Sequence, residues 1–221
     1  PAQTLSYSIV GGADAAKFAI NASTGALSFV TAPDFEAPTD AGADNTYDVT
    51  VQVSDGTLTS TQAIAVTVTP VNDNTPAIPS SATASVAENT TAVMTVTATD
   101  ADLPAQTLSY SIVGGPDAAK FAINASTGAL SFVTAPDYEA PTDAGADNTY
   151  DVTVQVSDGS LTSTQAIAVT VTPVNDNTPA ITSSATANVA ENSTAVLTVT
   201  ATDADLPAQT LSYSIVGGAD A

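Results

Sequence analysis

The chain repeats itself with a fixed offset of 103 residues. Residues 1–118 align with residues 104–221, and the two copies differ only at these eight pairs of positions: Ala13/Pro116, Phe35/Tyr138, Thr57/Ser160, Pro79/Thr182, Ser85/Asn188, Thr90/Ser193, Met94/Leu197 and Pro116/Ala219. Solenoid units have periods of about 20–50 residues, whereas a period near 100 is the length of a whole domain with its own core. The chain is therefore expected to be a string of near-identical domains, built for length, valency or mechanics.

Apolar and polar residues alternate with a period of two between turn signals such as Asp158-Gly159. In residues 150–157, one Tyr and three Val alternate with Asp, Thr, Gln and Ser, which is typical of a strand with one buried face. Short strands separated by turns about every ten residues indicate a β-sandwich. Seven strands per repeat are predicted near residues 83–87, 92–99, 107–112, 119–123, 129–133, 149–157 and 161–172.

Two Pro/Asn/Asp segments, residues 70–76 and 173–179, mark the predicted domain boundaries. They divide the chain into a module lacking its first two strands (1–76), a complete module (77–179) and the opening strands of a third (180–221). The favoured explanation is an excerpt from a long tandem array. The alternative is head-to-tail strand donation, in which residues 180–221 of one copy complete residues 1–76 of another.

The charge balance narrows the classes of function that this chain can have. There are 23 acidic residues against two Lys, no Arg and no His, so the net charge is −21. Such a charge excludes nucleic acid and anionic membranes as electrostatic partners, and no apolar stretch approaches the roughly 20 residues needed for direct membrane insertion. With no His, Cys or Trp, the chain is not expected to be an enzyme. Without disulfides, the modules must be held by their core, by a metal, or by both.

Acidic and amide residues gather at five places in each period, and no single place can supply the six to eight oxygen ligands that Ca²⁺ prefers. Several of these groups together could supply that many oxygen ligands if they converged on a linker. Asp and Asn also favour turns for purely local reasons. We assign the following to that structural role: Asp40, Asp44, Asp48, Asp143, Asp147 and Asp151.

The combined motifs resemble those of a known family. They are Ala87-Glu88-Asn89, Asp100-Ala101-Asp102, Phe121-x-Ile123 with Thr127-Gly128, Pro136-Asp137-Tyr138-Glu139, Val156-Ser157-Asp158-Gly159 and Val174-Asn175-Asp176-Asn177-Thr178-Pro179. Together they resemble the cadherin repeat, and most closely the cadherin-like repeats of bacterial surface adhesins. The resemblance implies a Greek-key sandwich of the cadherin/immunoglobulin-like type, with calcium at the joints between modules.

The resemblance also implies a ligand set for each joint. For the first joint the set is Asp34, Glu36, Asn72, Asp73, Asn74, Asp100, Asp102 and Asp158. For the second joint it is Glu88, Asp137, Glu139, Asn175, Asp176, Asn177, Asp203 and Asp205, and Glu191 is the counterpart of Glu88 in the third module. The family usually has an Asp where this chain has Pro70 and Pro173, so each linker lacks one carboxylate. We expect two or three Ca²⁺ ions at each complete joint.

These features predict a secreted or cell-surface array that acts as a stiff stalk, fibre or adhesive surface. Its expected partners are other copies of itself or cell-surface and matrix ligands. Two alternatives stay open: a filament subunit assembled by strand donation, and a calcium-dependent glycan-binding module.

Overall fold

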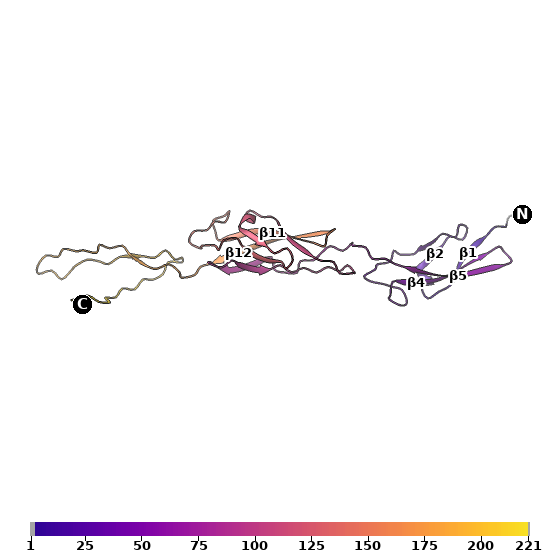
Figure 1. Ribbon diagram of the computed structural model, residues 1–221, viewed down its shortest axis with the longest axis horizontal. Helices are drawn as coiled ribbons and strands as arrows, with labels where there is room; N and C mark the ends of the chain where they lie inside the picture. Colours follow the sequence, from indigo (N-terminus) through magenta and orange to yellow (C-terminus); the bar gives the residue numbers. More distant parts are fainter. Residues whose placement is uncertain (1–2, 221) are drawn as a thin grey trace. The chain divides into compact units, whose positions relative to one another are not determined.

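The computed structural model describes residues 3–220, which divide into two compact units (Figure 1). Unit 1 takes the chain up to Pro76 together with Asp100–Thr107 and Asp158–Leu161, and unit 2 takes Ala77–Thr99, Leu108–Ser157 and the chain from Thr162 onward. Two loops of the second repeat thus belong with the first repeat. The predicted division into modules 1–76, 77–179 and 180–221 stays a prediction.

Unit 2 contains two sheets that together form a sandwich. The first has the order β6 (Thr83–Ala87), β12 (Thr162–Thr172), β11 (Thr149–Ser157) and β8 (Ser109–Gly114), and β11 and β12 are labelled in Figure 1. The second has the order β7 (Ala92–Thr95), β10 (Ala129–Phe132) and β9 (Phe121–Ile123). All neighbours are antiparallel except β6 and β12, which pair in parallel.

The core of unit 2 follows from the period-two pattern. Every second residue of β11, from Tyr150 to Val156, is buried, because alternate side chains of a strand point to the same face. The rings of Phe121 and Phe132 stack with centroids 4.6 Å apart, and Tyr150 meets Phe132 edge-on at 5.1 Å. The all-β prediction is confirmed: apart from two three-residue 3-10 turns, the elements of residues 3–220 are strands.

Three strands differ from the predicted bounds by more than one residue. The strand expected over 92–99 ends at Thr95, because the backbone of Val96 turns to donate to the carbonyl of Gly128. The strand expected over 107–112 lies at 109–114, where the pairing with β11 has a register shift. Residues 118–120 form the 3-10 turn η2 (Ala118–Lys120), so the next strand begins only at Phe121.

Unit 1 repeats part of this arrangement. Its elements are β1 (Ser6–Gly11), η1 (Ala15–Lys17), β2 (Phe18–Ile20), β3 (Leu27–Phe29), β4 (Thr46–Ser54) and β5 (Thr59–Thr67), with the sheets β1-β4-β5 and β2-β3 (Figure 1). Among the described strands, none pairs with β5 on its far side, whereas β6 covers the equivalent β12. Ile64 and Val66 of β5 are therefore only half-buried, although their counterparts Ile167 and Val169 are fully buried.

The last part of unit 2 carries little regular structure. β13 (Ala180–Ile181) and β14 (Ala201–Thr202) form a two-residue antiparallel pair, and Ile215 and Val216 beyond them are exposed. Over residues 3–220, the chain has no helix with the length and apolar character that a membrane crossing requires.

Candidate metal centres

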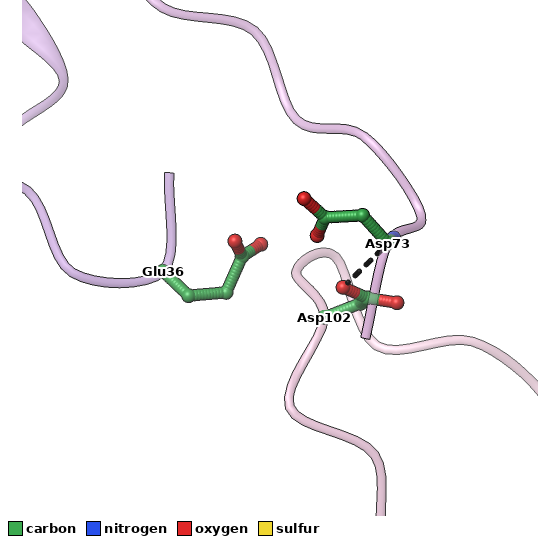
Figure 2. A group of neighbouring side chains, drawn as sticks. All are labelled: Glu36, Asp73 and Asp102. Carbon is green, nitrogen blue, oxygen red and sulfur yellow. Dashed lines mark hydrogen bonds between the residues drawn. The ribbon is translucent and has the colours of Figure 1, made fainter. Parts of the chain in front are cut away.

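Three carboxylates of unit 1 meet where the linker approaches two loops. Glu36 follows β3, Asp73 lies in the linker after β5, and Asp102 lies between β7 and β8. One oxygen from each lies within 4.8 Å of the others, and Figure 2 shows the three side chains converging. We call this group cluster I. Asp102 is only 1% exposed, so its charge is held largely out of water.

The backbone holds cluster I in place. Asp102 Oδ1 accepts hydrogen bonds from Asn74, from the backbone N–H at 3.1 Å and from Nδ2 at 2.7 Å, and a longer one from the N–H of Asp73 at 3.4 Å. Burial acts to raise the pKa of Asp102, but these bonds outweigh it and hold the pKa below the ordinary value. Glu36 Oε1 accepts from the N–H of Leu103 at 3.0 Å.

Cluster II shares one residue with cluster I. Asp100, Asp102 and Asp158 each offer a carboxylate oxygen within 4.8 Å of the others. The N–H of Asp102 donates to Asp100 Oδ1 at 2.9 Å, as expected for an Asp-x-Asp turn. Asp158 follows β11 and its Oδ1 accepts from the N–H groups of Ser160 and Leu161, both at 2.7 Å. A carboxylate common to two clusters can bridge two cations.

The carboxyl of Asp158 is prepared for a charged state. The hydrogen bond from Ser160 has the largest effect on its pKa, and the bonds from Leu161 and from the Asn72 side chain act the same way. Together they outweigh burial, so the pKa of Asp158 lies below its ordinary value. Asp158 is 7% exposed, so its charge is held largely out of water.

Several buried oxygens of unit 1, two of them from cluster II, have no hydrogen-bond donor. They are Asn72 Oδ1, Asp100 Oδ2, Gln106 Oε1 and Asp158 Oδ2. A buried acceptor without a partner costs about 1–3 kcal/mol, and native structures leave few of them unsatisfied. Carboxylate and amide oxygens are the ligands that Ca²⁺ takes. The donor set therefore fits a hard divalent cation.

Cluster III lies in unit 2 and contains Glu88, Glu139 and Asp176. Glu88 is 2% exposed and accepts two backbone hydrogen bonds of 2.7 Å, from Tyr138 to Oε2 and from Val174 to Oε1. One carboxylate thus ties the start, the middle and the end of the repeat together. The other two carboxylates of the cluster are held less fully.

The carboxylates of Glu139 and Asp176 each accept one described hydrogen bond from a segment distant in sequence. Glu139 Oε1 accepts from the N–H of Leu206 at 2.9 Å, while its Oε2 is buried without a donor. Asn89 has a positive φ of 62° and donates from Nδ2 to the Asp176 carboxylate. Cluster III therefore combines a rigid member, Glu88, with two members that keep oxygen capacity for a cation.

The remaining predicted residues lie outside these clusters. Asp34 and Asp137 cap turns: each accepts from the N–H two residues ahead, that of Glu36 or Glu139, at 3.0 Å. Asp203 accepts from the N–H of Asp205, also at 3.0 Å. Four predicted residues contribute amide groups or lie apart from the clusters: Asn74 and Asn177 donate to Asp102 and Asp205, Asn175 donates to Gln209, and Glu191 is exposed.

Sequence reasoning missed two amide residues: Asn89, which donates to Asp176 of cluster III, and Gln106 of unit 1, whose buried oxygen has no donor. Asn89 belongs to the quoted Ala-Glu-Asn motif, and its neighbour Glu88 was the only member treated as a ligand. Gln106 follows the Asp-Ala-Asp motif by four residues, and in a chain this rich in amides and hydroxyls no pattern singles it out.

The fold and the sites define an all-β protein whose sandwich carries acidic clusters suited to a hard cation. Residues 82–172 match the family model described as Cadherin domain. This part of the chain is therefore a cadherin domain, and the resemblance found in the motifs is confirmed at that level. The same motifs recur on both sides of it through the 103-residue offset.

The relatives agree with this assignment. Protocadherin Fat 1 of Homo sapiens is 32% identical over an alignment of 229 positions, which covers 96% of this chain and 5% of that protein. A bacterial protein, Chitinase A of Pseudoalteromonas piscicida, is 36% identical over 124 residues, which are 56% of this chain and 14% of that protein. The chain thus spans only a small part of these relatives.

A solved structure supports the sandwich fold. The crystal structure of mouse cadherin-23 EC22-24 superposes with a TM-score of 0.65 and 26% identity, covering 91% of this chain and 66% of that one. The β-sandwich predicted from the period-two pattern is therefore confirmed as the cadherin-like type.

Proposed function

We propose that this chain is a calcium-binding extracellular repeat that stiffens a tandem array. The observation that carries the proposal is the set of buried, donor-free oxygens around Asp100 and Asp158. Repulsion among clustered carboxylates opposes their approach, and a bound divalent cation offsets it. The similarity to the cadherins supports the choice of calcium and an extracellular location.

The clusters suggest the number of ions. Clusters I and II share Asp102, so we infer two ions at the first linker, bridged by that carboxylate. Cluster III would hold one more at the second linker. Under the 103-residue offset, Glu36 and Asp73 are the counterparts of Glu139 and Asp176, so a complete joint would combine all three clusters. This agrees with two or three ions for each complete joint.

The role of the ions would be mechanical. Each ion would join oxygens from the linker to oxygens from the sandwiches that flank it, and so restrict the angle between modules. We propose that the array projects or supports other domains in adhesion or matrix building, in a secreted or surface-attached protein of bacterial type. The match to a bacterial protein supports that origin.

Small-angle X-ray scattering in millimolar calcium and in excess EGTA tests this function, because the maximum dimension of the chain depends on the angle at each linker. We expect a single long dimension in calcium and a shorter, broader distribution in EGTA. An unchanged distribution, together with no calcium uptake by calorimetry, would overturn the proposal.

A second candidate, calcium-dependent glycan binding, is favoured by one observation, the 124-residue match to Chitinase A. The name of that protein refers to its action on chitin, and a repeat attached to such an enzyme could hold its substrate. Pull-down with insoluble chitin in calcium and in EGTA tests this candidate. Calcium-dependent retention would favour it over the purely mechanical role.

The strand-donation alternative has its own observation. β5 is an edge strand in the described sheet β1-β4-β5, so its outer backbone groups are open to pairing, and its side chains Ile64 and Val66 are only half-buried. Residues 186–190 repeat the sequence of β6, with Asn188 in place of Ser85, so another copy could supply them. Size-exclusion chromatography over a range of concentrations separates the two: a constant monomer favours the stalk, and growing polymers favour the filament.

A further inference from the structure

The side chain of Gln106 has a buried oxygen that no described group satisfies. It follows Asp102 by four residues, and both belong to unit 1. Gln106 Oε1 has no hydrogen-bond donor, in company with Asn72 Oδ1 and with Asp158 Oδ2, whose carboxylate is 7% exposed. Three donor-free oxygens thus come from three separate segments of unit 1, and such oxygens are acceptors that a bound cation can satisfy.

The second copy of the motif shows what this glutamine contacts when its surroundings differ. Gln209 is the counterpart of Gln106. Its Oε1 accepts from Asn175 Nδ2 at 2.7 Å, and its Nε2 lies 3.5 Å from Asp205 Oδ2. From the repeat relation we expect the Gln106 amide to lie beside Asn72 and Asp102, at the edge of cluster II.

The two copies differ in the hydrogen-bond partner of the linker asparagine, and this difference affects the Gln106 side-chain oxygen. In unit 1 the side chain of Asn72 donates to Asp158, whereas its counterpart Asn175 donates to Gln209. Residues 1–221 contain no counterpart of Asp158 for the second copy. Where Asp158 is present, the asparagine amide turns to it and the glutamine oxygen is left without a donor.

We propose that Gln106 Oε1 is a neutral side-chain ligand of the cation held by cluster II. This inference rests on the proposed calcium function. Cluster II offers three carboxylates, and Ca²⁺ takes six to eight oxygens from carboxylates, amide carbonyls and water. Asn72 and Gln106 add two uncharged oxygens from the opposite sides of the motif, completing the coordination without adding charge to a crowded acidic site.

Calcium titration of the 221-residue chain tests the role, with native mass spectrometry to count the ions. In Gln106→Leu we expect the cluster II ion to bind at least about tenfold more weakly, the scale on which removing a metal-site partner acts. In Gln106→Glu, which keeps an oxygen at the same place and adds charge, we expect tighter binding. Gln209→Leu is the matched control and should leave the first-linker affinities unchanged.

Each outcome is decisive. Unchanged affinity in Gln106→Leu would overturn the inference, and so would weaker binding in both Gln106 variants, because that result assigns the role to the amide NH₂ rather than to the oxygen. Thermal unfolding in EGTA checks folding: a ligand role predicts that Gln106→Leu is no less stable than the wild type without calcium, because it loses a buried acceptor that has no donor. If the wild type takes up no calcium at all, the proposed function fails, which is a different result.

Discussion

Glu36 accepts a hydrogen bond from the backbone N–H of Leu103, a residue 67 positions later, at 3.0 Å. The same bond recurs one period on, from Leu206 to Glu139, at 2.9 Å. In both copies, a glutamate of one repeat accepts a hydrogen bond from the leucine that directly follows the Asp-Ala-Asp motif of the next repeat. These backbone contacts therefore hold one carboxylate of cluster I and one of cluster III in place.

Replacing the shared carboxylate should remove two ions together. In Asp102→Asn we expect the chain to lose both first-linker ions at calcium concentrations that saturate the wild type, because clusters I and II both use this side chain. Native mass spectrometry measures the loss directly. The matched control is Asp205→Asn, the same substitution one period later, which should leave the first-linker ions in place. Loss of one ion only would show that Asp102 does not bridge.

Calcium should stabilise the folded chain more strongly as its free concentration rises, with the logarithm of that concentration once it exceeds the Kd. A ligand that binds only the native state at 100 times its Kd adds about 2.7 kcal/mol per independent site. Thermal unfolding followed by circular dichroism in a calcium series, and in EGTA, measures this increase. The transition should also rise with NaCl in EGTA, because salt screens repulsion in a chain of net charge −21. A transition that ignores calcium would contradict this expectation.

Glu88 should matter even without calcium. Glu88→Ala leaves the partly buried N–H groups of Tyr138 and Val174 without acceptors, and each such loss costs about 1–2 kcal/mol, the lower part of the range for a buried group. We expect a fall of about 2–4 kcal/mol in the free energy of unfolding in EGTA, measured by urea denaturation. Glu191→Ala removes the exposed counterpart and should change stability little. Equal effects of the two variants would show that the Glu88 contacts do not hold the module.

Asp143 should give a pH-dependent contribution. Burial acts to raise its pKa, but the N–H groups of Asp147, Asn148 and Gly145 outweigh it, so the pKa lies below the ordinary value. A lowered pKa stabilises the folded state above about pH 4 and loses this effect as the pH falls through the folded value. In EGTA, Asp143→Asn should therefore cost about 1–3 kcal/mol at pH 7.

The difference between wild type and Asp143→Asn should shrink toward pH 3. Urea denaturation at pH 7, 5, 4 and 3 follows it, and using the difference removes the general effect of charge repulsion. The exposed Asp151 supplies a control, Asp151→Asn, which should show little difference at any pH. A gap between wild type and Asp143→Asn that stays constant down to pH 3 would contradict the assigned role of this carboxyl.

The sequence predicted the strands well wherever one face is buried. Alternation in residues 149–157 marks β11 to the residue, because a half-buried strand leaves a period-two trace. The turn η2 was missed: it depends on the bond from the N–H of Lys120 to the carbonyl of Asp117, which leaves no such trace. The end of β7 was missed for a similar reason.

The acidic clusters were predictable in part. The repeat and the motifs placed Glu36, Asp73 and Asp102 at the same linker, and the structure brings them together. They could not separate Asp34 from Glu36, two residues apart, of which only Glu36 joins a cluster while Asp34 caps the turn. That choice depends on backbone direction within a loop. Asn89 was missed because its role follows from a positive φ.

The Glu88 carboxylate joins the segments of Tyr138 and Val174 within one domain through two hydrogen bonds. In a stretched chain of these domains, the linkers would therefore give way before the domains do. These two bonds join protein atoms only. Loss of calcium would therefore loosen the linkers while each sandwich kept these contacts. Under tension, such a fibre would lengthen by straightening its hinges and would recover as soon as the ion returned, since nothing inside a domain would have to refold.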